Sequence, residues 1–188
     1  MQRKFLRRIK KRTNYKERTA LLKSRQLRFV IRPSLNNIHI QIVKFDKNGD
    51  ETVVEGISKN LKKVGWKGHC GNVSASYLTG LMVGHKAVKL GVKEAILDIG
   101  LKRSTKQNVL YAACKGAIDA GLNIPVGENI LPSNERISGK HIEDYAKNLK
   151  MNDTRYKRQF SAYLKNGLDP EKISEHFEHI KKTLIQMR

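Results

Sequence analysis

The chain has 188 residues, of which 39% are hydrophobic and 29% charged, and 38 Lys and Arg against 17 Asp and Glu give it a net charge of +21. This length fits one domain with extensions, and the charge indicates an anionic partner without indicating a fold. The composition excludes a transmembrane helix, since no run of about 18 apolar residues occurs, and two distant cysteines without zinc spacing are typical of reduced thiols in a cytosolic protein.

The first segment, residues 1–25, is predicted to be a basic arm. Residues 1–32 hold thirteen Lys or Arg and one acid, Glu17, with few apolar residues among them. Such a segment is expected to be poorly ordered alone and to become ordered on a polyanion. Within it, Asn14 is placed to cap a short helix, and Glu17 three residues later completes a capping box.

Nucleic acid is the polyanion that fits this arm best. A secretory signal needs an apolar stretch of about 7–15 residues after its basic start, and none follows. A mitochondrial transit peptide is Ser-rich, whereas the arm has only Ser24, and Phe5, Leu6 and Ile9 are too few for a membrane-surface helix. Lys and Arg that neutralise phosphates dominate nucleic-acid affinity. The candidate residues of the arm are Lys4, Arg7, Arg8, Lys10, Lys11, Arg12, Tyr15, Lys16, Arg18, Lys23 and Arg25.

Three strands in an antiparallel meander are predicted after the arm. They are expected over residues 27–32, 36–45 and 51–57. The dipeptide Asn48-Gly49 between the second and third is a strong hairpin signal. In the second strand Ile38, Ile40 and Ile42 alternate with polar residues, which predicts one apolar and one polar face.

Helices and strands are predicted to alternate through the rest of the core. Helices over residues 72–90 and 108–120 flank a strand over 92–100, and a short strand is expected at 122–127. The mostly apolar segment 92–100 is typical of a buried parallel strand. The order βββαβαβ indicates an α/β fold with a mixed five-stranded sheet in a core over residues 26–130.

The tail, residues 131–188, is predicted to be a C-terminal extension of three helices. Asp169 as N-cap, Pro170 in the first turn and Glu171 favour the start of the last helix. Its apolar stripe consists of Ile173, Phe177, Ile180 and Leu184. We expect this stripe to dock on the core or on a neighbouring molecule.

Catalytic chemistry has little support in the sequence. Asp98 stands at the end of a strand where a metal-dependent nuclease with such a core would carry an acid, but two-metal chemistry needs several converging carboxylates. The first strand and the helix 72–90 contain none. His176 and His179, one turn apart, do not make a metal site by themselves. We therefore expect Asp98 to be structural or loop-capping, and we expect no enzyme activity, metal, cofactor or small-molecule substrate.

Two surfaces of the core are candidate anion sites. The loop 102–106 lies between a strand and a helix, so backbone N–H groups, the helix dipole and three cations are expected to converge there. The polar face of the meander is expected to be open, because both core helices are expected on the other face. Trp66 is expected either to stack on an unpaired base or to fill the core. The candidates are Arg28, Arg32, Ser34, Asn36, His39, Gln41, Trp66, Lys67, Lys102, Arg103, Ser104, Thr105 and Lys106.

The kind of nucleic acid follows from the absence of a DNA-reading motif. The sequence contains no helix-turn-helix pattern and no zinc finger. Polar strands, loops and an arm that folds on binding suit structured RNA better. Two alternatives remain open beside a fixed RNA target: a metal-dependent nuclease, and a basic RNA chaperone without a fixed target.

Four stretches of the chain resemble one known family. The stretches RTNYKERTALLKS, GNVSASYLTGLMVG, VKEAILDIGL and KGAIDAGLNIP closely resemble the archaeal and eukaryotic branch of the 5S-rRNA-binding protein of the large ribosomal subunit, universal large-subunit family eighteen. The resemblance runs from about Arg7 to the C-terminal helices. It implies a ribonuclease-H-like sheet in the order 3-2-1-4-5, no catalysis and a place in the cytoplasmic ribosome. The implied partners are 5S rRNA, large-subunit rRNA and neighbouring proteins of the central protuberance.

The resemblance also implies RNA contacts for individual residues. Residues of this chain that match the family's arm, first two strands and loop are Arg7, Arg8, Arg12, Tyr15, Arg18, Lys23, Arg28, Arg32, Ser34, Gln41 and Thr105. The chain departs from the family beside that loop, where Gln107 replaces the usual Gly and Val109 a basic residue. The loop is therefore the part of the interface that the resemblance defines least.

Overall fold

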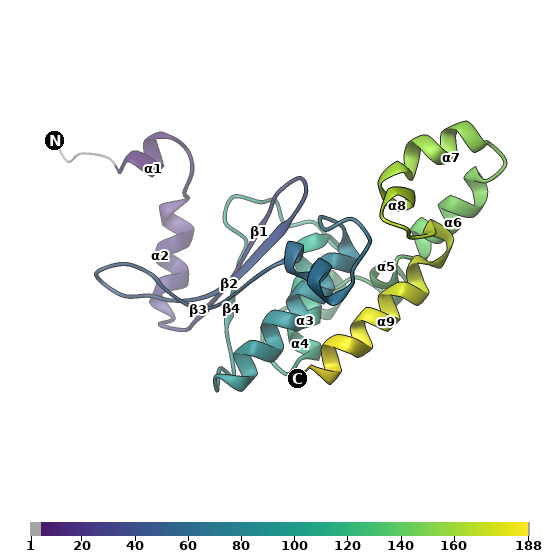
Figure 1. Cartoon of the computed structure of the whole chain (residues 1–188). Coiled ribbons are helices and arrows are strands. Elements are labelled where there is room, and N and C mark those ends of the chain that lie inside the picture. Colours follow the sequence, from purple (N-terminus) through teal and green to yellow (C-terminus); the bar gives the residue numbers. More distant parts are fainter. Residues whose placement is uncertain (1–4, 188) are drawn as a thin grey trace.

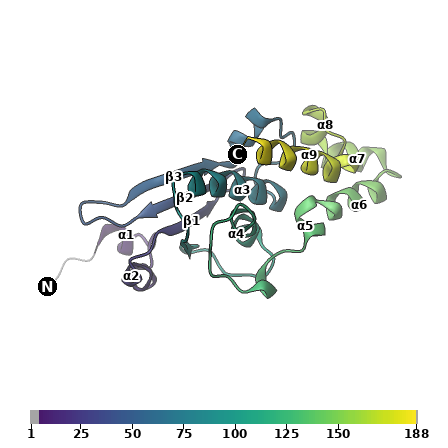
Figure 2. The same ribbon diagram turned by 90° about the horizontal axis from the view of Figure 1, so that it is seen from below.

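Residues 5–187 are described by the computed structural model of the chain, so the candidate Lys4 lies outside the described residues. Figure 1 shows a central sheet with two amino-terminal helices at one end and the carboxy-terminal helices at the other. The view from below in Figure 2 separates the same two groups of helices. No helix in this range is both long and apolar enough to cross a membrane.

The arm forms two short helices, α1 (Leu6–Ile9) and α2 (Tyr15–Lys23), neither of which buries a residue. The side chain of Asn14 accepts hydrogen bonds from the backbone N–H groups of Lys16 and Glu17, at 3.1 and 3.4 Å. These bonds satisfy two of the amide groups that a helix leaves free at its start. The predicted N-cap is therefore confirmed, whereas the ordering of the arm on a polyanion stays a prediction.

The meander is confirmed. Its strands are β1 (Arg28–Pro33), β2 (Ile38–Lys44) and β3 (Glu51–Ile57), each antiparallel to the next. A fourth strand, β4 (Ile96–Asp98), pairs in parallel with β1, which gives the sheet the order β3-β2-β1-β4. The predicted strand over 92–100 is thus shorter than expected but parallel, as its apolar composition indicated.

The predicted fifth strand does not form, and the described residues give a four-stranded mixed sheet. Residues 122–127 contribute one isolated bridge, between Glu94 and Asn123, in which Ala95 N–H donates to Asn123 O at 3.0 Å. Pro125 follows two residues later and has no N–H to donate, so the ladder cannot continue through it. The segment keeps the place expected of a neighbour of β4 without becoming a strand.

Two helices, α3 (Val73–Lys89) and α4 (Val109–Asp119), pack on the apolar face of the sheet. Phe29, Ile31 and the three alternating isoleucines of β2 are fully buried there. The helices touch through glycines: a Cβ on Gly80 would lie 2.0 Å from the carbonyl oxygen of Ala113. Only a residue without a side chain permits so close an approach of the two backbones.

The tail forms more helices than predicted. The 3-10 turn η2 (Glu128–Ile130) precedes the tail, and η3 (Pro170–Lys172) lies within it. The α-helices of the tail are α5 (Asn134–Ser138), α6 (Lys140–Leu149), α7 (Asp153–Gln159), α8 (Ser161–Lys165) and α9 (Ile173–Gln186). Gly139, in the left-handed region at φ 90°, separates α5 from α6. The second of the three tail helices was expected to carry Tyr156, Phe160 and Tyr163 on one face. It is broken at Phe160, which leaves helical geometry (φ −101°, ψ 15°) and packs on the rings of Tyr156 and Tyr163.

The apolar stripe of α9 docks on the core, which was one of its two expected positions; the other was a neighbouring molecule. Its four residues, Ile173, Phe177, Ile180 and Leu184, are all buried. They share a hydrophobic cluster with the start of α3 and with Leu61 of the 3-10 helix η1 (Ser58–Val64). α3 is therefore the central helix, with the sheet and α4 on one side and α9 on the other.

Candidate nucleic-acid interface

The arm presents its cations to solvent. Its exposed basic residues in the described range are Arg7, Arg8, Lys10, Lys11, Arg12, Lys16, Lys23 and Arg25, while Arg18 is partly buried. Two local contacts shape the arm: the rings of Phe5 and Tyr15 stack with centroids 5.0 Å apart, and Arg7 Nε donates to Thr13 Oγ1 at 2.9 Å. Between the helices lies a hollow of about 360 Å³. Its lining residues are Arg8, Thr13, Asn14, Tyr15, Lys16 and Thr19, a set with two cations and no carboxylate.

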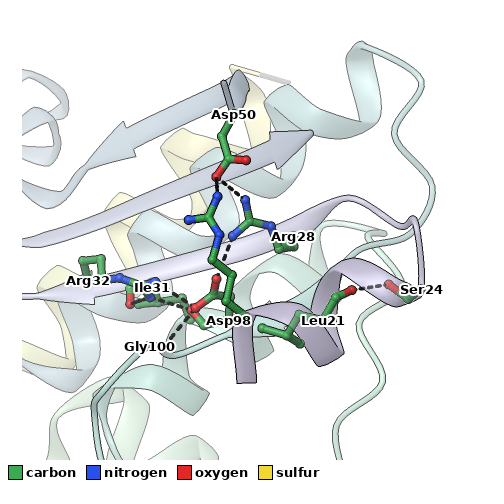
Figure 3. Close-up of polar contacts among 9 residues, drawn as sticks. Leu21, Ser24, Arg28, Ile31, Arg32, Asp50, Asp98 and Gly100 are labelled. Carbon is green, nitrogen blue, oxygen red and sulfur yellow. Dashed lines mark hydrogen bonds and ion pairs between the residues drawn. The ribbon is translucent and has the colours of Figure 1, made fainter. Parts of the chain in front are cut away.

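α2 is tied to the sheet by alternating charges. Arg18 of α2 donates from Nη2 to Oδ2 of Asp50 at 2.8 Å, and Arg28 of β1 donates to the same oxygen. Figure 3 shows Asp50 above Arg28, with Asp98 and Arg32 on the other side of the network. Because Asp50 sits in the β2–β3 hairpin, these bonds join the arm, the hairpin and β1.

Arg28 lies inside the protein. Its side chain is 5% exposed, and its guanidinium donates to Asp50 and, from Nη1, to Oδ2 of Asp98 at 3.0 Å. The sequence placed Arg28 on an open polar face, but two carboxylates from distant segments cover and neutralise it. A contact between this guanidinium and an RNA phosphate would require both ion pairs to open, so the structure does not support Arg28 as an exposed contact.

Asp98 is a structural residue that caps a loop, as predicted. Its Oδ1 accepts from Arg32 Nη2 at 2.8 Å and from the backbone N–H of Gly100 at 3.0 Å. Burial alone would raise the pKa of Asp98, but hydrogen bonds and charge from Arg32 and Arg28 outweigh it and hold the pKa below its usual value. Both oxygens are thus committed to protein donors. In the part of the chain described, no three His, Cys, Asp or Glu side chains group to hold a metal ion.

The polar face of the sheet carries mixed charge. Arg32 remains 44% exposed although it bonds Asp98, while His39 Nε2 lies 3.6 Å from Glu55 Oε2 and Gln41 Nε2 donates to the same oxygen at 3.4 Å. At the end of this face Ser34 closes the β1–β2 turn by bonding Asn37, and Asn36 is exposed. Several candidates therefore meet on one surface, with a carboxylate among them.

The loop 102–106 is exposed throughout, but the backbone N–H groups at the start of α4 behind it are partly used. The side chain of Asn108 caps α4 by accepting from the N–H groups of Leu110 and Tyr111, at 2.8 and 3.2 Å. Ser104 bonds the hydroxyl of Tyr111 at 2.5 Å, and Thr105 accepts from Asn108. The expected convergence of free amide groups is therefore reduced, and the loop offers mainly the cations Lys102, Arg103 and Lys106, each exposed.

Trp66 fills the core, which was the second of its two expected roles. The ring is 2% exposed, its Nε1 donates to the carbonyl oxygen of His69 at 3.4 Å, and it stacks on His176 with centroids 5.2 Å apart. Buried in this way, it presents no face to an RNA base. The adjacent Lys67 is exposed.

Asp50 is the residue of this network that the sequence reasoning missed. It sits in a polar hairpin, where an acid is ordinary, and it meets Arg28 across 22 positions of sequence. Only the antiparallel register of β1, β2 and β3 brings the two side chains together. A pattern within one segment carries no signal for such a pair.

Comparison with known proteins gives two matches. The family model described as "Ribosomal large subunit proteins 60S L5, and 50S L18" matches residues 1–93 and 90–127. The "Large ribosomal subunit protein uL18" of Methanococcus maripaludis is 48% identical over 183 residues, which cover 97% of this chain and 95% of that protein. The similarity therefore includes the arm, the core and the C-terminal helices.

Proposed function

Since the chain belongs to the family of large-subunit ribosomal proteins that the family model describes, we propose that it binds 5S rRNA and helps attach this RNA to large-subunit rRNA in the central protuberance. It acts there as a structural component of the cytoplasmic ribosome. Neighbouring large-subunit proteins are further partners. We assign it no catalytic step.

The observation that supports this function most directly is the cationic arm. Its basic side chains are exposed, its two helices bury no residue, and a carboxylate-free hollow lies between them. Apart from the Arg18–Asp50 ion pair and the Arg7–Thr13 hydrogen bond, the exposed cations of the arm are available to a partner, and a phosphate backbone binds such cations with release of counterions. The arm over residues 1–25 is thus the principal RNA-binding element, with Lys4 included in the proposal.

The core over residues 26–130 fixes the orientation of the RNA. Exposed candidates on the polar face and in the loop are Arg32, Ser34, Asn36, His39, Gln41, Lys67, Lys102, Arg103, Ser104, Thr105 and Lys106. We keep Arg28 as a residue that positions Asp50 and Asp98, and we leave Trp66 in the core. The order β3-β2-β1-β4 supports a ribonuclease-H-like sheet, in which 122–127 would hold the place of a fifth strand.

A binding titration tests this function. The full chain is titrated with 5S rRNA and, separately, with an unrelated structured RNA of the same length, at several salt concentrations. We expect tighter binding of 5S rRNA at physiological salt. If six to ten phosphates are neutralised and each contributes the salt dependence known for duplex DNA, affinity should fall by about three to five decades between 50 and 200 mM salt. Equal affinity for both RNAs would instead indicate a chaperone without a fixed target.

A further inference from the structure

A second basic hollow lies where the C-terminal helices meet the core. Its volume is about 350 Å³, within the range of small-ligand pockets. We call it the seam pocket and define it by Asn36, Lys59, Lys62, Lys67, Tyr163 and Asn166. These residues come from the β1–β2 turn, from η1, from the loop after η1 and from the α8 region, so the pocket exists only when the tail is docked.

Hydrogen bonds across the seam hold the pocket in shape. Asn166 Nδ2 donates to the carbonyl oxygen of Lys67 at 3.0 Å, and the backbone N–H of Lys67 donates to His176 Nε2 at 3.1 Å. The ring of His176 stacks in turn on the buried Trp66. The loop that carries Lys67 is therefore fixed to the C-terminal helices on two sides, and the pocket is formed before any ligand arrives.

The charge of the seam pocket suits an anion. Lys59, Lys62 and Lys67 are exposed at its edge, and its lining as the structure describes it includes no Asp or Glu. The other hollow of the C-terminal helices, about 460 Å³, differs because Asp153, Asp169 and Glu171 line it. A polyanion is attracted to the first hollow and repelled by the carboxylates of the second.

The remaining lining suits a base better than a bare phosphate. Tyr163 is partly buried in the wall beside Ala162 and Cys70, which gives an aromatic and apolar surface. Asn36 and Asn166 add amide groups that both donate and accept hydrogen bonds. Proteins bind unpaired RNA bases by aromatic stacking together with hydrogen bonds to the base edge. Leu35 next to Asn36 is 93% exposed and offers further apolar surface at this turn.

We propose that the seam pocket binds one unpaired nucleotide of ribosomal RNA, with the lysines on its phosphates and Tyr163, Asn36 and Asn166 on its base. This inference rests on the proposed function, since it takes ribosomal RNA as the partner. It adds that the C-terminal helices form part of an RNA site and do not serve only as contacts for proteins. The nucleotide belongs either to 5S rRNA or to large-subunit rRNA.

The test uses full-length variants that remove charge or fill the space. In K59Q/K62Q two exposed lysines of η1 lose their charge. The matched control, K86Q/K89Q, removes the same charge from two exposed lysines of α3 that do not line the pocket. Ala162→Leu fills the pocket without changing charge, and Ala162→Ser is its control. Thermal unfolding of each variant establishes that it is folded.

Each variant is titrated separately with 5S rRNA and with large-subunit rRNA. For one of the two RNAs we expect about a tenfold loss of affinity in K59Q/K62Q and in Ala162→Leu, and little change in the controls. The salt slope for K59Q/K62Q should fall by about 0.7 for each phosphate of an unpaired strand that the variant no longer neutralises. The RNA that responds is the source of the nucleotide.

The two ideas fail in different ways. If the unmodified chain binds neither RNA, the proposed function itself is wrong. If it binds but K59Q/K62Q and Ala162→Leu behave like their controls with both RNAs, the function stands and the seam pocket is not an RNA site.

Discussion

Arg28 donates a hydrogen bond to Asp98 at 3.0 Å, and the two side chains are 5% and 8% exposed. The pair links β1 to β4, the only parallel strands that the structure describes. Its consequence is that one arginine and one aspartate that look functional in the sequence neutralise each other inside the protein. Removing one member of such a buried pair leaves the other charge without compensation.

Asp98→Asn should therefore destabilise the fold. The substitution keeps the shape of the side chain but leaves Arg28 with one carboxylate partner, Asp50, and weakens the bond to Arg32. We expect a loss of about 3–5 kcal/mol in the free energy of unfolding, measured by denaturant titration. Asp98→Asn and the unmodified chain should not differ in RNA cleavage. Magnesium-dependent RNA cleavage by the unmodified chain that Asp98→Asn abolishes would instead support the alternative of a metal-dependent nuclease.

The same pair should make stability depend on acid pH. Since the pKa of Asp98 is lowered in the fold, its contribution is complete above the ordinary carboxyl pKa of about 3.9 and is lost as pH falls through the lower folded value. Unfolding titrations between pH 5 and pH 2 should show a steeper loss in the unmodified chain than in Asp98→Asn. Parallel curves would mean that the carboxylate is not held by its arginines.

Asp50→Asn should loosen α2 from the sheet. Asp50 is the shared partner of Arg18 and Arg28, and it connects the arm helix to the hairpin. We expect faster amide hydrogen exchange over residues 15–23, while exchange in β1 and β2 stays slow. Glu51→Gln, an exposed carboxylate one residue away, is the matched control. If exchange in α2 is equally fast in both variants and in the unmodified chain, the ion pair does not hold the helix.

Local patterns in the sequence predicted much of the fold. Alternating isoleucines predicted the apolar and polar faces of β2, Asn14 predicted the start of α2, and the mostly apolar segment 92–100 predicted a parallel strand. Each of these depends on neighbours within a few residues. The prediction of a fifth strand was wrong because Pro125 interrupts the hydrogen-bond ladder. The prediction of one continuous second tail helix was wrong because the chain bends at Phe160, whose ring packs in an aromatic cluster.

The candidate site was predictable where side chains act alone. The exposed cations of the arm and of the loop 102–106 follow from composition, because such groups have nowhere to be buried. The fates of Arg28 and Trp66 depend on partners far along the chain: Asp98 is 70 positions from Arg28, and His176 contacts the ring of Trp66 from the last helix. One strand or loop read alone cannot reveal these partners.

Gly80→Ala should be strongly destabilising. The added Cβ would lie 2.0 Å from the carbonyl oxygen of Ala113, so α3 and α4 would have to move apart. Overpacking of this kind costs about 1–3 kcal/mol or more. Gly127→Ala is the control, because its nearest neighbour would be 3.9 Å away. Similar midpoints of thermal unfolding for the two variants would rule out the close helix contact.

His176→Gln should remove part of the stability change near neutral pH. Burial lowers the pKa of His176, and the charges of Lys67 and His179 lower it further. The unfolded chain therefore takes up this proton first, so stability is complete above about pH 6.5 and falls as pH decreases. Glutamine can still accept the Lys67 N–H bond but does not titrate. Between pH 7 and 5 the free energy of unfolding of His176→Gln should depend less on pH than that of the unmodified chain. The two slopes should differ by at most about 1.4 kcal/mol per pH unit.

The identity of the RNA that accompanies the chain tests the central claim most directly. The full-length chain, tagged and recovered from its own cells at moderate salt, should carry 5S rRNA far above the share of that RNA in the extract. Sequencing of the bound RNA measures this enrichment. RNA that merely mirrors the composition of the extract, with no excess of 5S rRNA, would contradict the account.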